Sequence, residues 1–216
     1  VELAVYIRDR APAVRFTGRA YVLPRAADAA LPVETVNTAT LELSLRRVDD
    51  RNLLRSMQQG YFGKPLSYWE DQQFTSEVGQ VVWTGVAEVG NELNRDMTTR
   101  LPMGDALQGL KPGIYALKAA IPDVDPQDEP GATQWFVLSD LGLSVLRGVD
   151  GVHVSLRGLG DAQPVAGVQV QLISRANAVL GVAETDASGA VTFAPGLALG
   201  KGGAEPALIM ARMNDD

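Results

Sequence analysis

Residues 33–48 carry the clearest pattern in this chain, a regular alternation of leucines with polar residues. The leucines are Leu41, Leu43 and Leu45. On a helix, positions two apart point to different sides, whereas on a strand they share one face. The pattern therefore predicts a half-buried strand of an antiparallel sheet.

Similar runs recur along the rest of the chain, separated by turn residues. They predict strands at residues 3–8, 14–23, 79–89, 94–101, 114–121, 133–138, 151–159, 164–173, 179–183, 190–193 and 207–213. We expect the third and fourth of these runs to pair through a turn at Gly90, and residues 103–110 to form a single helical turn. No crossover helix separates consecutive runs, so the sheets are predicted to be antiparallel and to form β-sandwiches.

One helix is predicted, from Asp50, which can cap its first turn, to Gly60, which can end it. Its narrow apolar stripe consists of Leu53, Leu54 and Met57. An aromatic, irregular stretch follows, containing Tyr61, Phe62, Tyr68, Trp69 and Phe74. These rings could form a carbohydrate or peptide platform, but we favour a satellite core beneath a long loop.

The stretch 132–148 closes one block of alternating residues and opens another. It divides the chain into two tandem β-sandwiches, residues 1–138, with a helical and aromatic insertion at about 50–74, and residues 139–216. The chain begins at Val1 rather than Met, and it ends just after an apolar run. We therefore expect a fragment of a longer protein, with the second sandwich cut at its C-terminus.

The connection between the predicted sandwiches is short, Ser139–Asp140. A linker this brief, with Leu141 and Leu143 able to pack, is expected to limit movement between the sandwiches.

Composition excludes several classes of function. The formal charge is −7 and the basic residues are scattered, so neither nucleic acid nor anionic membrane is expected as a partner, because phosphate binding needs clustered Lys and Arg. Cysteine is absent, which excludes disulfides, zinc–thiolate sites and thiol nucleophiles. No apolar run approaches the roughly 18 residues of a spanning helix, so no membrane insertion is expected.

The acidic loop at 122–130 offers oxygen ligands that could suit calcium. They are Asp123, Asp125, Asp128 and Glu129. The loop lacks the glycine and the distant bidentate glutamate of the familiar calcium loop, and two prolines stiffen it. We expect a solvated loop between strands.

No other stretch carries a complete reactive constellation. The single histidine, His153, is expected on the solvent face of its strand, because a metal site needs several converging ligands. Ser139 and Ser188 lie in turns without an activating base. The glycines at 200–203 lack the strand–loop–helix context of a phosphate loop. We expect no catalytic, cofactor-binding or metal-binding residues, and no enzyme.

Several strings of residues carry a family resemblance. In the second block they are 135–143 (WFVLSDLGL), 151–156 (GVHVSL), 164–170 (PVAGVQV) and 185–190 (TDASGA), with Phe193; in the first block they are 21–24 (YVLP), 33–37 (VETVN) and 111–115 (KPGIY). The second block resembles the repeated macroglobulin domain of bacterial α2-macroglobulins, and the first resembles the domain that precedes it. The turns at 111–113 and 185–189 set up the strands that follow them.

This resemblance implies a scaffold fragment of a broad-spectrum protease inhibitor that acts by bait cleavage and entrapment in periplasmic defence. The family's thioester lies in a Cys-Gly-Glu-Gln motif, which a chain without cysteine lacks, and no bait segment is evident. The implied partners are neighbouring macroglobulin domains, target proteases through the full-length protein and, as in some members, a penicillin-binding protein. The implied location is the periplasm, with the full-length protein anchored to the inner membrane as a lipoprotein.

A second hypothesis comes from the aromatic residues. An adhesion or carbohydrate-binding module would use Tyr68, Trp69 and Trp83 as a stacking platform. Glycan binding to such a platform would quench tryptophan fluorescence, whereas a scaffold would not respond.

Overall fold

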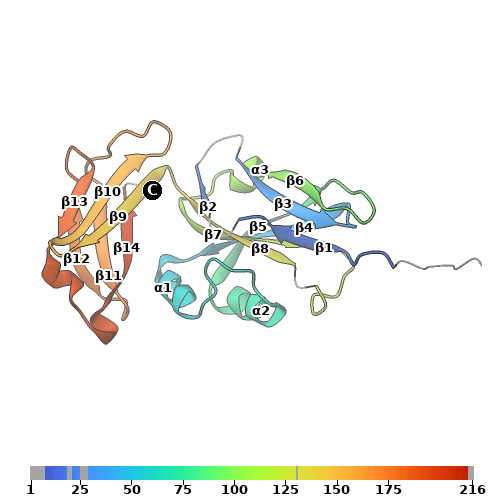
Figure 1. Cartoon of the computed structure of the whole chain (residues 1–216), viewed down its shortest axis with the longest axis horizontal. Helices are drawn as coiled ribbons and strands as arrows, with labels where there is room; N and C mark the ends of the chain where they lie inside the picture. The colour runs from blue at the N-terminus through green and yellow to red at the C-terminus, as the bar shows by residue number, and fades with distance from the viewer. Residues whose placement is uncertain (1–7, 19–20, 25–28, 130, 214–216) are drawn as a thin grey trace, which may run out of the picture.

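The computed structural model describes residues 8–18, 21–24, 29–129 and 131–213, and most of the strand expected at 3–8 lies outside these ranges. Two β-sandwiches follow one another along the chain (Figure 1). The predicted fold class, all-β with tandem sandwiches and a short helical insertion in the first, is confirmed. None of the helices in the described ranges has the length and apolar character needed to cross a membrane.

The first sandwich contains a five-stranded and a three-stranded sheet. The larger sheet has the order β2 (Tyr21–Leu23), β8 (Ala132–Leu138), β7 (Gly113–Ala120), β4 (Thr40–Val48), β5 (Gly79–Glu88). The smaller sheet has the order β1 (Ala13–Phe16), β3 (Ala30–Val36), β6 (Met97–Pro102). The helices are α1 (Asp50–Gln58), α2 (Tyr68–Glu77) and the single turn α3 (Gly104–Leu107).

The larger sheet is covered on both faces. Leu41, Leu43 and Leu45 of β4 are buried in the core between the two sheets, as their alternation predicted. The opposite face carries Val48, Ala116 of β7 and Trp135 of β8, which pack with Phe74 of α2 in a second buried cluster. Figure 1 shows α1 and α2 on that side of the sheet, with β3 and β6 on the other. The first sandwich is therefore three layers deep at this point.

The second sandwich pairs two three-stranded sheets. One has the order β13 (Ala190–Phe193), β10 (Gly151–Gly158), β9 (Leu141–Gly148), and the other β12 (Val179–Glu184), β11 (Gln169–Ser174), β14 (Pro206–Arg212). The core between them includes Val152, Val154 and Leu156 of β10 with Val170 and Leu172 of β11. The predicted alternations in these strands are confirmed, and residues 195–204 form two short 3₁₀ turns, η1 (Pro195–Ala198) and η2 (Gly202–Ala204).

The turn at 185–189 shows how local chemistry sets up a strand. Oδ1 of Asp186 accepts hydrogen bonds from the backbone N of Ser188 at 2.8 Å and of Ala190 at 3.0 Å. Hydrogen bonds from Ser188 and Ala190 lower the pKa of the Asp186 carboxyl. Gly189 has φ +75°, and a Cβ there would lie 2.4 Å from the backbone O of Leu156, so glycine is required on both counts.

Three predicted pairings and segments are wrong in detail. The runs at 79–89 and 94–101 form β5 and β6, but they pair with β4 and β3 respectively, in different sheets. The run at 14–23 divides into β1 and β2, which also belong to different sheets. β2 pairs with β8 in parallel, because β1 and β2 cross from one sheet to the other instead of forming a hairpin. The remaining strand pairs are antiparallel among the described residues.

The stretch from Tyr61 to Phe74 was predicted to be irregular, but it contains the beginning of α2. Ser67 caps this helix, and its partner Glu70 three residues later completes a capping box. That sequence signal is present in the chain. The helix predicted at 50–60 is confirmed, although Met57 is 40% exposed and does not belong to its buried stripe.

Candidate functional site: a charged pocket beside α2

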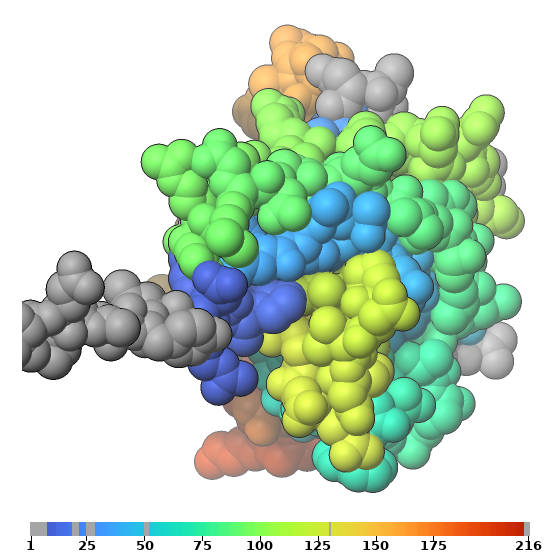
Figure 2. Space-filling view, turned by 90° about the vertical axis from the view of Figure 1, so that its right-hand side faces the viewer, coloured from blue at the N-terminus to red at the C-terminus, as the bar shows by residue number. Residues whose placement is uncertain are grey.

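A pocket of about 580 Å³ lies on the helical face of the five-stranded sheet, where α2 stops covering the strands. Its walls come from α2 and from the loop between β7 and β8, and its floor from β4, β5 and β7. The lining residues include Glu42, Ser44, Arg46, Asp71, Gln72, Thr75, Thr84, Lys118 and Pro126. Figure 2 shows that loop (yellow) next to the start of β4 (light blue) and the α2–β5 segment (teal).

Asp71 joins two cations in this pocket. Its Oδ1 accepts a hydrogen bond from Nη1 of Arg46 at 2.5 Å, and its Oδ2 accepts one from Nζ of Lys118 at 2.5 Å. Nη1 of Arg46 also donates to Oγ1 of Thr75 at 2.8 Å. The side chains of Arg46, Asp71 and Lys118 are 2%, 6% and 19% exposed. A buried charge is tolerated when it is paired and hydrogen-bonded, and Asp71 supplies that pairing for both cations.

Arg46 has hydrogen-bonding capacity that its neighbours do not use. Its Nε and Nη2 are buried and have no hydrogen-bond acceptor among the residues that the structure describes. Its guanidinium carbon lies 5.0 Å from the centroid of the Phe74 ring, so the ring face offsets part of the charge. The buried cluster therefore has two cations and one carboxylate.

The capping box at the start of α2 helps to fix Asp71 in place. The side chain of Ser67 accepts from the backbone N of Glu70, and the backbone N of Ser67 donates to Glu70 Oε2 at 3.0 Å. Lys64 Nζ donates to Glu70 Oε1 at 2.6 Å. The hydrogen bonds from Lys64 and Ser67 lower the pKa of Glu70 to about 2. Because Asp71 is the next residue, this cap also orients it toward the sheet.

The aromatic residues form a core and not a platform. Tyr61 and Phe74 are buried with Trp135, whose Nε1 donates to the backbone O of Lys64 at 3.1 Å. The satellite-core interpretation of the cluster is thus confirmed for these rings. The stacking-platform hypothesis fails on geometry, because Trp83 packs against the leucine core on the other face of the sheet.

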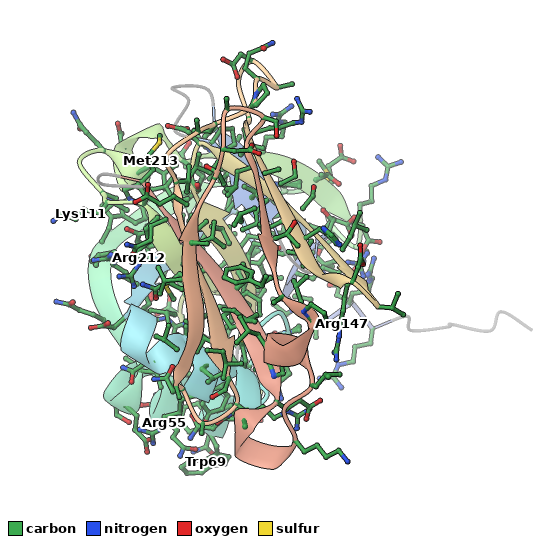
Figure 3. The ribbon with its side chains drawn as sticks, turned by 90° about the vertical axis from the view of Figure 1, so that its left-hand side faces the viewer. Arg55, Trp69, Lys111, Arg147, Arg212 and Met213 are labelled. Atoms are coloured by element: carbon green, nitrogen blue, oxygen red, sulfur yellow. The ribbon has the colours of Figure 1, made fainter. Side chains whose placement is uncertain are left out.

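Trp69 is the exposed member of the aromatic group. It is 73% exposed and makes an edge contact with Tyr68, with ring centroids 5.0 Å apart. Figure 3 shows it at the outer edge of the molecule. With Trp83 on the other face, Tyr68 and Trp69 form only a small exposed aromatic surface.

The remaining sequence candidates are not brought together. His153 lies on the surface of β10, as predicted, with Nδ1 3.0 Å from Oγ1 of Thr192 and Nε2 3.1 Å from Oδ2 of Asp150. Its hydrogen bond lowers the pKa of Asp150. Ser188 donates to Asp186 within its turn. Within the described ranges no three His, Cys, Asp or Glu residues are placed to hold a metal ion, and this includes Asp123, Asp125, Asp128 and Glu129 of the acidic loop.

The residues at 200–203 belong to an irregular turn that includes η2. A Cβ on Gly200 would lie 2.0 Å from the backbone O of Ala204, so this glycine allows a close approach of two backbone segments. That is a structural role and not a phosphate cradle.

The charged pocket itself was not predicted from the sequence. Arg46 follows Leu45 in the alternating run, and that alternation says nothing of what covers the second face of the strand. The helix carrying Asp71 was missed, although the Ser67–Glu70 spacing signals its start. Lys118 lies within a run predicted as a strand, and no sequence signal relates it to the other two residues.

The connection between the sandwiches is hydrogen-bonded to both of them, and on the first side the backbone N of Ser139 donates to the backbone O of Leu23 at 3.3 Å. Oγ of Ser139 accepts from the backbone N of Leu141 at 2.9 Å, and the backbone O of Asp140 accepts from the backbone N of Leu159 at 2.8 Å. A second contact joins the sandwiches away from the connection, where Nε2 of Gln58 donates to the backbone O of Arg175 at 2.7 Å.

Comparison with known proteins identifies the protein family of these two sandwiches. The model of the bacterial alpha-2 macroglobulin MG2 domain matches residues 15–120, and that of the MG3 domain matches residues 138–216. The curated α2-macroglobulin of Escherichia coli (strain K12) is 25% identical over 190 residues. That alignment covers 88% of this chain and 11% of the relative, so the chain spans about a tenth of that protein's length.

Solved structures show the same fold. A crystal structure of native α2-macroglobulin from Escherichia coli spanning domains NIE-MG1 has a TM-score of 0.74 at 22% identity, over 94% of this chain and 93% of that one. The cryo-EM reconstruction of the native conformation of E. coli α2-macroglobulin has a TM-score of 0.66 at 25% identity, over 97% of this chain and 12% of that one. The chain therefore belongs to the bacterial α2-macroglobulin family, and it matches the domains that the family models name MG2 and MG3.

Proposed function

We propose that this chain is a scaffold in a bacterial α2-macroglobulin, and that it holds neighbouring domains in fixed relative positions. The full-length protein would inhibit proteases of broad specificity by trapping them after they cleave a bait segment elsewhere in the chain. Its place would be the periplasm, as a lipoprotein of the inner membrane. Family membership and the curated relative support this proposal.

The observation that carries the scaffold role is the joint between the sandwiches. β8 ends at Leu138 and β9 begins at Leu141, so only Ser139 and Asp140 connect two packed strands. Both residues are engaged by hydrogen bonds, and Gln58 adds a contact to the second sandwich. Because this joint is short and held by hydrogen bonds, it keeps the two sandwiches in a fixed relative orientation.

A loop insertion in the full-length protein tests the scaffold role. A short Gly-Ser insertion between Ser139 and Asp140 lengthens the joint without changing either core. We expect weaker protease inhibition with unchanged bait cleavage, because trapping depends on domain geometry and cleavage does not. The same insertion between Val149 and Asp150, in the exposed turn between β9 and β10, serves as the control. Full inhibition by the joint variant would reject the scaffold role.

A further inference from the structure

The floor of the charged pocket consists of two rows of residues that run across three strands. Thr84 of β5, Ser44 of β4 and Lys118 of β7 are register partners in one row. Val86, Glu42 and Ala120 form the next row. The first row has two small hydroxyl side chains beside the ammonium group of Lys118, so the hollow lies directly next to a cation.

The charged side chains around this hollow are buried to different extents. Arg46 and Lys118 share the single carboxylate of Asp71, and all three side chains are largely buried. Glu42 also lines the pocket, but it is exposed to solvent. Removing a cation from water is costly unless an anion compensates it. The buried part of the pocket is therefore short of one negative charge.

The groups that face the hollow suit a carboxylate. An ammonium has three donor hydrogens, and Lys118 gives one of them to Asp71 in the described contacts. The hydroxyls of Ser44 and Thr84 stand in the same row and can donate as well. Charge-assisted hydrogen bonds of this kind are about twice as strong as neutral ones.

We propose that this pocket binds a carboxylate beside Lys118 and so completes a cluster of two cations and two anions. The carboxylate is either an Asp or Glu side chain of a docked peptide segment or a free small carboxylate. This binding is independent of the proposed scaffold function, since it requires neither a bait segment nor a trapped protease.

A titration of the chain followed by ¹H–¹⁵N NMR tests the site. The probes are sodium acetate and a short blocked peptide with one glutamate, at constant ionic strength because exposed charges are screened by salt. We expect saturable shifts of the backbone amide signals of Ser44, Gln72, Thr84 and Lys118. A lower Kd for the peptide than for acetate identifies the ligand as a side chain of a peptide, and equal Kd values identify it as a free carboxylate. Shifts that grow linearly with either probe would overturn the proposal.

Lys118→Gln should weaken the binding of both probes at least tenfold, because it removes the main donor. The matched control is Lys111→Gln, which removes the same charge from an exposed position that does not line the pocket. The control should bind as the unchanged protein does. Equal binding by both variants would overturn the site.

Ser44→Asp gives a readout that needs no ligand. It would place a carboxylate in the row beside Lys118, supply the second anion and block binding of both probes. We expect its Tm to exceed that of Ser44→Asn, which has the same shape without the charge. A lower Tm for Ser44→Asp than for Ser44→Asn would contradict the shortage of negative charge.

Discussion

The two faces of the five-stranded sheet are built from the same strands, but different kinds of side chains are buried on each. On one face the leucines of β4 meet the three-stranded sheet in a continuous apolar core. On the other face α1 and α2 cover part of the sheet, and β4 offers Glu42, Ser44 and Arg46. The comparison teaches that alternation identifies one buried face and leaves the second undetermined. Here the second face is also buried in part, by helices, with a charged cluster in place of leucines.

Asp71→Asn should have the largest effect on this comparison. The change keeps the shape of the side chain and leaves Arg46 and Lys118 buried without a carboxylate. Breaking a buried ion pair by removing one partner costs about 3–5 kcal/mol. Urea unfolding measures the loss, and Asp128→Asn at an exposed position in the loop between β7 and β8 is the control. A loss below about 1 kcal/mol would show that the charges on this face are well solvated, as those of surface ion pairs are.

Leu45→Ala tests the apolar face at the position directly before Arg46. The side chain is fully buried in the leucine core, and truncating a buried leucine costs about 2–5 kcal/mol. The measurement is again urea unfolding, with Val86→Ala of β5, which is 71% exposed, as the control. If both variants unfolded at the same urea concentration, the leucine core would not be the dominant support of this sheet.

An apolar replacement of the whole cluster sharpens the contrast between the faces. Replacing Arg46, Asp71 and Lys118 together by Met, Leu and Met should change the free energy of unfolding far less than Asp71→Asn does, since buried ion pairs are often neutral against apolar residues of similar volume. The triple variant should also lose carboxylate binding. A triple variant as unstable as the single one would show that the cluster itself stabilises the fold.

A smaller effect is expected from acid at the start of α2. The pKa of Glu70 is lowered to about 2 from its ordinary value of 4.5 by Lys64 and Ser67. Its ionised form therefore stabilises the folded state above pH 4.5, and this contribution is lost as the pH falls from about 4.5 to about 2. Tm measured across this range should fall less steeply for Glu70→Gln. Identical pH profiles would mean that the cap does not hold α2 on the sheet.

Trp69→Ala should have the smallest effect. The ring is mostly exposed on α2, and surface substitutions usually change stability by less than about 0.5 kcal/mol. Trp135→Ala, in the core beneath the same helix, should cost about 3–5 kcal/mol by comparison. Addition of oligosaccharides should leave the tryptophan fluorescence unchanged. Saturable quenching that Trp69→Ala removes would revive the carbohydrate-binding hypothesis.

The sequence was a good guide wherever one local rule acts alone. The alternation at Leu41–Leu45 predicted β4 and its buried face, and the TDASG turn predicted the start of the next strand, which is β13. It was a poor guide where distant segments decide the outcome. The partners of β5 and β6 depend on competition between sheets, and the burial of Arg46 depends on α2. The charged pocket forms only where β4, α2 and β7 come together, and no residue spacing along the chain predicts that these three elements are in contact.

The helical face also bears on the scaffold role. α1 lies on the same side of the sheet as α2, and its last residue, Gln58, reaches the backbone O of Arg175 in the second sandwich. Figure 1 shows α1 between the larger sheet of the first sandwich and the strands of the second. The layer that buries the charged cluster is thus also the layer that contacts the next sandwich. Together with the Ser139–Asp140 connection, it gives two points of attachment.

Residual dipolar couplings of the backbone amides test this central claim directly. Couplings from the two sandwiches, each fitted separately, report the orientation of each one in the same aligned sample. A rigid scaffold predicts one common alignment tensor for both, and two distinct tensors after a Gly-Ser insertion between Ser139 and Asp140. Two distinct tensors in the unchanged protein would contradict the account, because sandwiches that reorient independently cannot hold their neighbours in place.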